Sequence, residues 1–412
     1  MAETSIKDLP VDLLVRILSY VPTIDASRAT LVSQQWQNLW HHIARLNFDM
    51  SLYHSPSKKN LFNSREDFAE IVTQTLLLRP KTTPLDSFRL VFSYRRCLRT
   101  QRQVDSWIRH AITSGVGIFR LSFEGEQFIK TEGDSFARVC RNDGFPSLTS
   151  IYLHDVTLND EVLFAMVSNC VNLEFLSLSC LRGLRNFKIH SDSLEELVLG
   201  YFKPSFSRAV GSLDICAPNL STIAFEFFCV KKYYSSDLSS LVEADLDFTD
   251  GEQRDYIYCW DILKLLSGVD SLDILNLNIN QYILFEFVDI KYAPHRSVLM
   301  NVKYLALQTE YEESDLVRIG EFLKLCPELE LLVLDSLNEK DGRDSKEFKS
   351  KPLILEIPSL KQVEMKNYRG SENELYVVEV LKTHKVVLQK IVAFQQEVNG
   401  KLPPPFVLFD TS

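Results

Sequence analysis

A short apolar motif that recurs along most of the chain constrains the fold more than any other feature. It has the form apolar-x-x-apolar-x-apolar and returns from about residue 84 at intervals of 21 to 32 residues. Clear examples are Leu173/Leu176/Leu178, Leu194/Leu197/Leu199, Leu272/Leu275/Leu277 and Leu329/Leu332/Leu334. A unit this short cannot bury its apolar residues alone, so stacked neighbouring units must cover them.

Stripes with helical spacing precede several copies of the motif. They are Val162, Leu163 and Met166, then Leu316, Ile319 and Phe322, and finally Leu375, Val378 and Leu381. Ser314 and Asn373 stand where helix N-caps are expected. Helix, turn and short strand at this period predict an α/β leucine-rich-repeat array with parallel strands.

Within each predicted strand the last two apolar residues face inward, because strand side chains alternate. The residue between them therefore faces outward and is the natural binding surface of a stacked array. These outward residues are Arg89, Arg120, Tyr152, Ser177, Val198, Ala224, Asp245, Asn276, Ala306, Val333 and Glu364. The row is mixed in character and contains no catalytic constellation.

Two segments interrupt the repeats, and both read as loops. The first, 226–240, combines four aromatic residues with a Lys-Lys pair, and the second, 339–351, is strongly charged. The stretch 400–405 ends in three prolines and cannot continue a helix or a strand.

The first fifty residues predict three short helices. Leu13, Leu14, Ile17, Leu18 and Val21 form a helical stripe that begins after Pro10 and is stopped by Pro22. A second helix is expected at 26–32, and Ser33 can cap a third that contains Trp36, Leu39 and Trp40. Three such helices bury little surface alone, so a partner, or the rest of the chain, is expected to cover their surplus apolar surface.

Composition and charge exclude several classes of protein. The chain has 412 residues with 45% apolar residues and a net charge of −10, so it is a folded protein that disfavours general nucleic-acid binding. Its eight cysteines form no CxxC pair, it has no secretion signal or membrane span, and it shows no hydrolase, metalloprotease or phosphate-loop motif. We therefore expect a cytoplasmic or nuclear protein without catalytic residues, metal or cofactor, and without a membrane partner.

The charge is distributed unevenly, with about +6 in residues 51–110 against −15 in the remainder after residue 110. Arg95, Arg96 and Arg99 crowd one part of this interval, and Arg96, Arg99 and Arg102 are spaced near one helical turn. Guanidinium groups suit phosphate and carboxylate geometry, which makes Arg95, Arg96 and Arg99 a candidate anion or substrate contact. The competing interpretation is a solvated helix face.

The sequence at 6–49, IKDLPVDLLVRILSYVPTIDASRATLVSQQWQNLWHHIARLNFD, resembles the F-box of plant F-box/leucine-rich-repeat proteins. The resemblance lies in the Leu-Pro opening, Ile-Leu-Ser, Val-Ser-x-x-Trp-x-x-Leu-Trp and the closing Leu-x-Phe-Asp. Residues 358–394 are similar to the FBD region that often ends such proteins, through Leu360-Lys361-x-Val363, Tyr368-x-Gly370 and Glu374-Leu375.

This resemblance implies a three-helix F-box, a curved leucine-rich-repeat solenoid and a C-terminal FBD-like cap. The implied boundaries are 1–50 for the F-box, 51–83 for a connecting helical segment, 84–340 for the repeats, 341–357 for a charged loop and repeat edge, 358–394 for the FBD-like region and 395–412 for a tail. It also implies a non-catalytic substrate receptor of an SCF-type ubiquitin ligase, bound to a Skp-family adaptor and a cullin scaffold. The implied adaptor contacts are Leu9, Pro10, Leu13, Leu14, Ile17, Leu18, Val32 and Trp36.

Two other functions stay open at this point. One is a leucine-rich-repeat receptor for a small hormone-like or inositol-phosphate ligand, and the other is a scaffold that acts without a cullin.

Overall fold

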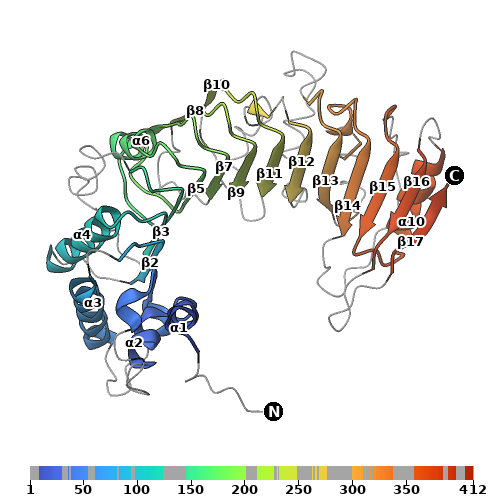
Figure 1. The fold of residues 1–412 in the computed structure, drawn as a ribbon. Coiled ribbons are helices and arrows are strands. Elements are labelled where there is room, and N and C mark those ends of the chain that lie inside the picture. Colours follow the sequence, from blue (N-terminus) through green and yellow to red (C-terminus); the bar gives the residue numbers. More distant parts are fainter. Residues whose placement is uncertain are drawn as a thin grey trace, which may run out of the picture. The chain divides into compact units, whose positions relative to one another are not determined.

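The computed structural model contains two compact units of helices and mostly parallel strands (Figure 1). It describes residues 9–29, 36, 39–53, 61–80, 83–93, 98–123, 145–200, 211–226, 230, 232–247, 262, 265–266, 269–275, 299–309, 311, 316, 319–320, 322–336, 357–383, 388–395 and 404–411. The N-terminal unit comprises Met1–Leu197, Tyr201–Arg208 and Asp214–Ala217, and the C-terminal unit comprises Val198–Gly200, Ala209–Leu213 and Pro218–Ser412. The boundary runs through β7 (Glu196–Gly200). Within the described residues, no helix combines the length and the apolar character needed to cross a bilayer.

The N-terminal unit begins with two short α-helices and a 3-10 helix. These are α1 (Val11–Leu18), α2 (Thr23–Ala29) and η3 (Leu39–His42). The carbonyls of Pro10 and Pro22 accept the first helical hydrogen bonds of α1 and α2, so each proline sets a helix start. The second helix therefore begins three residues before the predicted position. The predicted third helix is only the 3-10 turn at Leu39–His42, and its expected cap at Ser33 lies outside the described residues.

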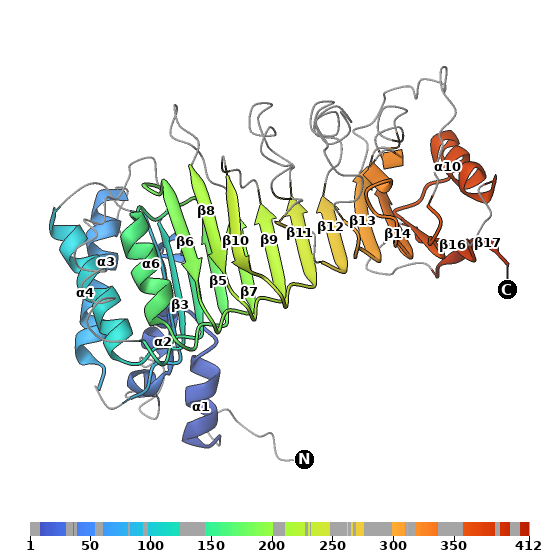
Figure 2. The same ribbon diagram turned by 90° about the horizontal axis from the view of Figure 1, so that it is seen from above.

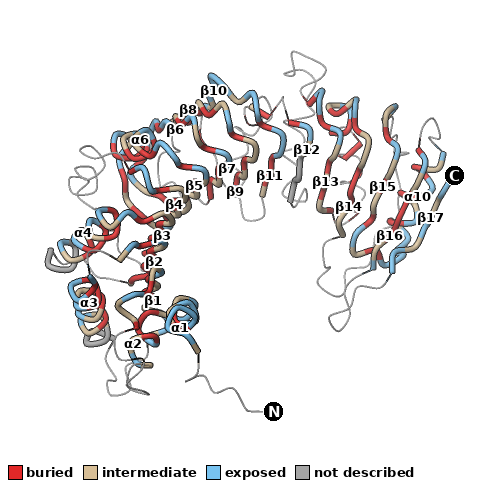
Figure 3. The backbone as a smooth tube through the Cα atoms, viewed as in Figure 1, coloured by how far each residue is buried: buried red, intermediate tan, exposed pale blue. Residues whose placement is uncertain are grey.

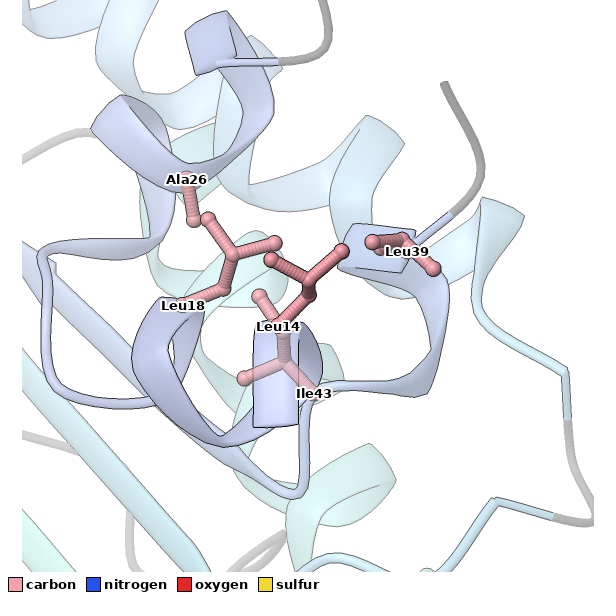
Figure 4. Packing of buried hydrophobic residues seen from close by; sticks show 5 residues of the cluster. All are labelled: Leu14, Leu18, Ala26, Leu39 and Ile43. Atoms are coloured by element: carbon pink, nitrogen blue, oxygen red, sulfur yellow. The ribbon is translucent and has the colours of Figure 1, made fainter. Parts of the chain in front are cut away.

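The three N-terminal helices share a small apolar core. Leu14, Leu18, Ala26, Leu39 and Ile43 point toward one another between α1, α2 and η3 (Figure 4). All five are at most 7% exposed, and Trp36 and Trp40 pack partly buried against them. Burying a leucine stabilises a fold by about 1.5–3 kcal/mol, which is how this short segment keeps its shape.

A parallel sheet follows directly from the F-box-like segment. Its strands in order are β1 (Arg45–Asp49), β2 (Ser87–Phe92), β3 (Ile118–Phe123), β4 (Ser150–His154) and β5 (Phe175–Ser179). The sheet thus begins one strand earlier than the motif search predicted, because Ile43, Leu46 and Phe48 also satisfy the motif. The strand that closes the F-box resemblance is therefore also the first strand of the repeat sheet.

Helices cover one face of this sheet (Figure 2). They are α3 (Leu61–Leu78), α4 (Leu98–Thr113) and α6 (Asp160–Asn169). The short η4 (Met50–Leu52) directly follows β1 in the chain. Phe92 of β2 stacks on Phe68 of α3 at 5.7 Å and meets Trp107 of α4 edge-on at 5.8 Å. The predicted stripe before Leu173 is confirmed as α6, with Asn159 as its N-cap.

The C-terminal unit repeats the same strand pattern. Its sheet order is β9 (Thr222–Glu226), β11 (Glu243–Asp247), β12 (Ser271–Leu275), β13 (Tyr304–Thr309), β14 (Leu331–Ser336), β15 (Gln362–Lys366), β16 (Lys390–Ala393) and β17 (Phe406–Asp410). All neighbouring pairs from β9 to β16 are parallel, which confirms the sequence prediction. The exception is β17, which follows the proline-rich stretch and pairs antiparallel with β16.

The register of β12 corrects one predicted repeat. Leu272 and Ile274 pair with Leu305 and Leu307, so the motif here is Val269/Leu272/Ile274 and not Leu272/Leu275/Leu277. The residue in register with Asp245 of β11 is consequently Asp273, and Asn276 lies outside the described residues. The sequence allows the motif to be placed in two ways here, because both sets of three positions hold apolar residues.

Three of the described strands lie outside the main sheet and were not predicted from the sequence. They are β6 (Asn186–His190), β8 (Ser212–Cys216) and β10 (Tyr233–Asp237). The strand β10 occupies part of the segment 226–240, which the sequence had predicted to be a loop. Its side chains are mostly exposed polar groups, so apolar periodicity could not reveal it.

The last helix, α10 (Glu372–Thr383), starts with a capping box. The Ser371 hydroxyl accepts a hydrogen bond from the Glu374 backbone N–H at 3.3 Å, and Glu374 accepts one from the Ser371 backbone N–H at 2.8 Å. Ser371 is therefore the N-cap, whereas the predicted cap Asn373 donates to the carbonyl of Tyr311 instead. The other predicted cap, Ser314, lies outside the described residues.

Alternation along the strands follows the predicted pattern of inward and outward residues (Figure 3). Between buried neighbours, Arg89, Tyr152, Ser177, Ala224 and Glu364 are partly exposed and Arg120 is exposed. Val333 departs from the pattern, since it is 1% exposed. It is a buried apolar residue and offers no binding surface.

Two cysteines serve as core residues and should be chemically inert in the folded protein. Burial raises the pKa of Cys170 and of Cys326 to about 12 in each case, and both are at most 1% exposed. Because the thiolate is the reactive form, we expect neither to be alkylated by iodoacetamide at pH 8 until the protein unfolds. Peptide mass spectrometry would show this, with the partly exposed Cys216 as the internal comparison. Rapid native labelling of Cys170 or Cys326 would contradict the packing.

Candidate functional site

Helix α1 presents apolar side chains on two sides. Leu14 and Leu18 are 0% and 2% exposed in the core, whereas Leu13 and Ile17 are 45% and 41% exposed. Leu13 and Ile17 are four residues apart, so they lie on one helix face about one turn from each other. The single apolar stripe predicted for α1 therefore has two sides. Leu14 and Leu18 face the core, and Leu13 and Ile17 face solvent.

The sequence-predicted adaptor residues consequently fall into groups. Leu13 and Ile17 are exposed, Pro10 is exposed beside them, and Leu9 and Trp36 are partly buried against the core. Leu14 and Leu18 are buried within the chain's own core and leave almost no surface for a partner, so their role is to hold α1 in place. Val32 lies outside the described residues.

Two further residues continue the exposed side of α1 into the turn after it and were not among the predicted contacts. Tyr20 and Val21, three and four residues after Ile17, are 67% and 36% exposed. Val11 is 51% exposed but stands two residues from Leu13 and therefore lies on another side of the helix. The Arg45 guanidinium lies 5.5 Å from the centre of the Tyr20 ring. Helical spacing from Leu13 through Ile17 to Tyr20 is the sequence signal that could have found this extension. We call Leu13, Ile17, Tyr20 and Val21 the α1 face.

The segment of short helices that carries the α1 face is joined to the repeat sheet by buried polar contacts. The Thr23 hydroxyl of α2, 1% exposed, accepts a hydrogen bond from the Asn47 backbone N–H of β1 at 2.7 Å. Arg79, 5% exposed at the end of α3, donates to the carbonyls of Ile43, Thr83 and Pro84. Burial lowers the pKa of Arg79 from its ordinary value, although nearby Asp86 opposes this. The helical segment is thus held against the sheet by polar contacts, which a search for apolar periodicity in the sequence cannot predict.

The predicted anion contact is only partly covered by the described residues. Arg95 and Arg96 lie outside them, and of Arg99 only the backbone is described, in the first turn of α4. Arg102 and Arg109 on the same helix are exposed. The contact at Arg95, Arg96 and Arg99 therefore stays a prediction.

A second feature is a hollow of about 390 Å³ on the sheet face formed by the outward side chains of β1–β5. Its polar lining includes Asp49, Arg89, Arg120, Tyr152, His154 and Ser179. The strand register places these residues in two rows. The first row is Asn47, Arg89, Arg120, Tyr152 and Ser177, and the second is Asp49, Val91, Ser122, His154 and Ser179.

The two arginines of the first row have different partners. Arg89 donates to the Asp49 carboxylate at 2.8 Å and to the Asn47 side-chain oxygen at 2.9 Å. Arg120 lies over the ring of Tyr152, 4.2 Å from its centre, and Tyr152 in turn stacks on Phe175 at 4.6 Å. Both arginines and Tyr152 stood in the predicted outward row, but Asp49, His154 and Ser179 did not. Asp49, His154 and Ser179 each stand two residues after the outward residue of their strand. This spacing is the sequence signal that could have identified them.

Asp49 is a buried, charged member of the hollow. Its residue is 8% exposed, and burial alone would raise the pKa of its carboxyl. Hydrogen bonds from Ser51 and Arg89 outweigh burial, so the pKa lies below its ordinary value. Asp49 is therefore a carboxylate at neutral pH and neutralises Arg89.

We expect Asp49→Asn to reduce the free energy of unfolding by about 1–2 kcal/mol at pH 7, because charge-assisted hydrogen bonds are lost. A lowered folded-state pKa contributes stability above the unfolded value, near pH 4, and loses it as the pH falls through the folded value. The difference from wild type should thus be constant above about pH 5 and shrink below about pH 4. Urea unfolding at several pH values would measure it. Asp25→Asn, in the exposed Asp25–Arg28 pair, is the control and should change stability by less than about 0.5 kcal/mol.

The chemistry of this surface is that of binding. Among the described residues, no group of three or more His, Cys, Asp or Glu side chains is placed to hold a metal ion. The hollow instead offers a stacked guanidinium, a neutralised ion pair and hydroxyl groups.

Comparison with known proteins yields two family matches. The F-box domain matches residues 6–46, and the family described as the At1g61320/AtMIF1 LRR domain matches residues 81–371. The chain is 24% identical over 388 residues to the F-box/LRR-repeat protein At1g06630 of Arabidopsis thaliana, which covers 89% of this chain and 91% of that protein. It is 27% identical over 265 residues to the F-box/FBD/LRR-repeat protein At5g56420 of the same plant, covering 59% of this chain and 60% of that protein.

These matches agree with the parallel repeat sheet and with the helical segment that precedes it. An F-box joined to leucine-rich repeats is the organisation of a substrate adaptor, and such proteins are typically non-catalytic. Because the repeat match alone spans more than half of the sequence, the chain belongs to the F-box/leucine-rich-repeat family.

Proposed function

We propose that this protein is the substrate receptor of an SCF-type ubiquitin ligase. In this proposal the α1 face docks on a Skp-family adaptor that is carried by a cullin scaffold, and the repeat sheet binds a protein target. The observation that carries the proposal is the exposed apolar side of α1. No residue of the chain needs to do chemistry, because holding the target near the ubiquitin donor raises the effective concentration of its lysines.

The α1 face has the size and character of a binding anchor. Single exposed apolar residues are ordinary on protein surfaces, but the four residues of the α1 face recur at helical spacing on one side of a short helix and the turn after it. Full burial of a valine or leucine side chain contributes about 1.5–3 kcal/mol. Leu9 and Trp36 pack, partly buried, against the core to which α1 contributes Leu14 and Leu18.

The domain boundaries predicted from the sequence remain part of this proposal. Residues 1–50 form the F-box, 84–340 the repeats and 358–394 an FBD-like cap, with β1 shared between the F-box and the sheet. The helical segment predicted at 51–83 agrees in position with α3.

Reconstitution tests the proposal directly. The purified full chain should co-elute with a Skp-family adaptor on size exclusion, and with a cullin only when that adaptor is present. Failure to bind the adaptor would contradict the proposal. Binding of the adaptor without recruitment of a cullin would favour the alternative of a scaffold that acts without a cullin.

A second candidate function is supported by the hollow on β1–β5, whose volume of about 390 Å³ lies in the range of small-molecule sites. Its free guanidinium would suit an anionic ligand such as an inositol phosphate. A thermal-shift titration with inositol hexakisphosphate tests this candidate. Stabilisation that is lost in an Arg120→Gln variant would support it.

A further inference from the structure

We propose that the hollow on β1–β5 binds an aspartate or glutamate side chain of the protein target, and that Arg120 is the residue that pairs with this carboxylate. This inference rests on the proposed function in one respect, namely that the repeat sheet binds a protein. It goes further by naming the chemical class that the sheet recognises and the residue that recognises it.

The first argument is the placement of two like charges side by side. Arg89 and Arg120 are direct neighbours in the register of β2 and β3, on the same sheet face. Adjacent strands are about 4.8 Å apart, so two guanidinium groups at this position repel one another. Asp49 neutralises Arg89 alone, and the Arg89 contacts with Asp49 and Asn47 draw it towards β1. The positive charge of Arg120 is therefore left uncompensated, and an anionic group of a ligand would stabilise it.

The second argument is that Arg120 is held in place without being neutralised. Its guanidinium stacks over Tyr152, and Tyr152 stacks on Phe175, so an aromatic ladder fixes the plane of the group. Among the described residues, no carboxylate forms an ion pair with Arg120, which is exposed. A planar guanidinium with a fixed orientation and free N–H groups is pre-organised for a bidentate carboxylate.

The charge of the hollow favours a carboxylate over a phosphate. Arg89, Arg120 and Asp49 together carry about one positive charge. One carboxylate would neutralise this charge, whereas a phosphate dianion would leave an excess of negative charge close to Asp49. The hydroxyls of Ser122 and Ser177, which make no hydrogen bond to other described residues, lie in the same rows and can donate to the bound side chain.

The size and position of the hollow favour a side chain that belongs to a peptide. A volume of about 390 Å³ exceeds what one carboxylate fills, so neighbouring groups of the ligand must occupy the rest. The two rows cross five strands, which gives an extended segment several adjacent outward positions to contact.

A peptide selection with the purified full chain tests the inference. Random dodecapeptides displayed on phage should yield, for wild type, sequences with Asp or Glu at one recurring position. The strongest peptide is then made with Glu, Gln or phosphoserine at that position, and its Kd is measured by fluorescence anisotropy. We expect the Gln peptide to bind at least tenfold more weakly, and Arg120→Gln to weaken the Glu peptide at least tenfold.

Matched variants separate recognition from stability. Arg109→Gln removes the same charge from an exposed site on α4 and should leave the Kd unchanged. Tyr152→Leu should weaken the Glu peptide about threefold or more, because it removes the stacking that orients Arg120 while the charge stays. Arg120→Gln should not lower the thermal stability, since Arg120 is exposed.

Several outcomes would overturn the inference. They are an absence of acidic enrichment, an equal loss of affinity in Arg109→Gln, and phosphoserine binding more than tenfold tighter than Glu. Because the peptides are tested on the chain alone, failure here leaves the adaptor interaction untouched. Failure of adaptor binding, measured separately, would in turn leave the peptide result standing.

Discussion

Replacing both Leu13 and Ile17 with alanine is expected to weaken binding of a Skp-family adaptor by about a hundredfold or more. Each substitution removes most of an apolar side chain from the centre of the α1 face. Losing about 1.5 kcal/mol at each position amounts to about 3 kcal/mol, which is more than two powers of ten in Kd. Isothermal titration calorimetry with the purified adaptor would measure the change. Thermal stability should be almost unaffected, because both side chains are more than 40% exposed.

Two control variants define what this result means. Leu77→Ala removes a leucine that is 72% exposed on α3, away from the α1 face, and should leave the affinity unchanged. Leu14→Ala removes a core leucine and should lower the free energy of unfolding by about 2–5 kcal/mol. If the Leu13→Ala/Ile17→Ala variant bound the adaptor as wild type does, the α1 face would not be the docking site.

Arg79→Met is expected to destabilise the N-terminal unit by about 3 kcal/mol or more. The substitution preserves an apolar stem but removes the donors to three carbonyls, those of Ile43, Thr83 and Pro84. Each buried polar group left without a partner costs about 1–3 kcal/mol. Urea unfolding followed by tryptophan fluorescence would measure the loss, because Trp107 lies in the core of the same unit.

The comparison for Arg79 is a matched exposed arginine. Arg102→Met changes the same side chain on α4, where it is exposed, and should alter stability by less than about 0.5 kcal/mol. Arg79→Lys should fall between wild type and Arg79→Met, since an ammonium keeps the charge but cannot reach three carbonyls with a planar fork. Equal stability of Arg79→Met and wild type would show that water satisfies these carbonyls.

The fold was predictable where apolar residues alternate, and it was missed where alternation is ambiguous or absent. The motif at Leu173/Leu176/Leu178 leads directly to β5, with Leu176 and Leu178 both fully buried. At β12 an apolar residue stands at either of two spacings, and only pairing with β13 selects Leu272 and Ile274. The strand β17 lies after three prolines and is set by antiparallel pairing with β16, which no local pattern encodes.

The candidate sites, too, could be predicted from the sequence only in part. Helical spacing placed Leu13, Leu14, Ile17 and Leu18 on one stripe, but it could not say which side of the stripe α2 and η3 would cover. The outward position of Arg89 and Arg120 followed from strand alternation. The pairing of Arg89 with Asp49, however, joins residues 40 positions apart and depends on the register of β1 with β2.

The sharing of β1 between the F-box and the repeat sheet has a consequence for missense alleles. A substitution that unfolds β1–β5 is expected to remove the α1 face and the hollow together, because both belong to one compact unit. Alleles that lose one activity and keep the other can arise only at exposed positions such as Ile17 or Arg120. A genetic screen for separation of function should therefore recover substitutions of surface residues. Substitutions of the core leucines should instead cause complete loss of function.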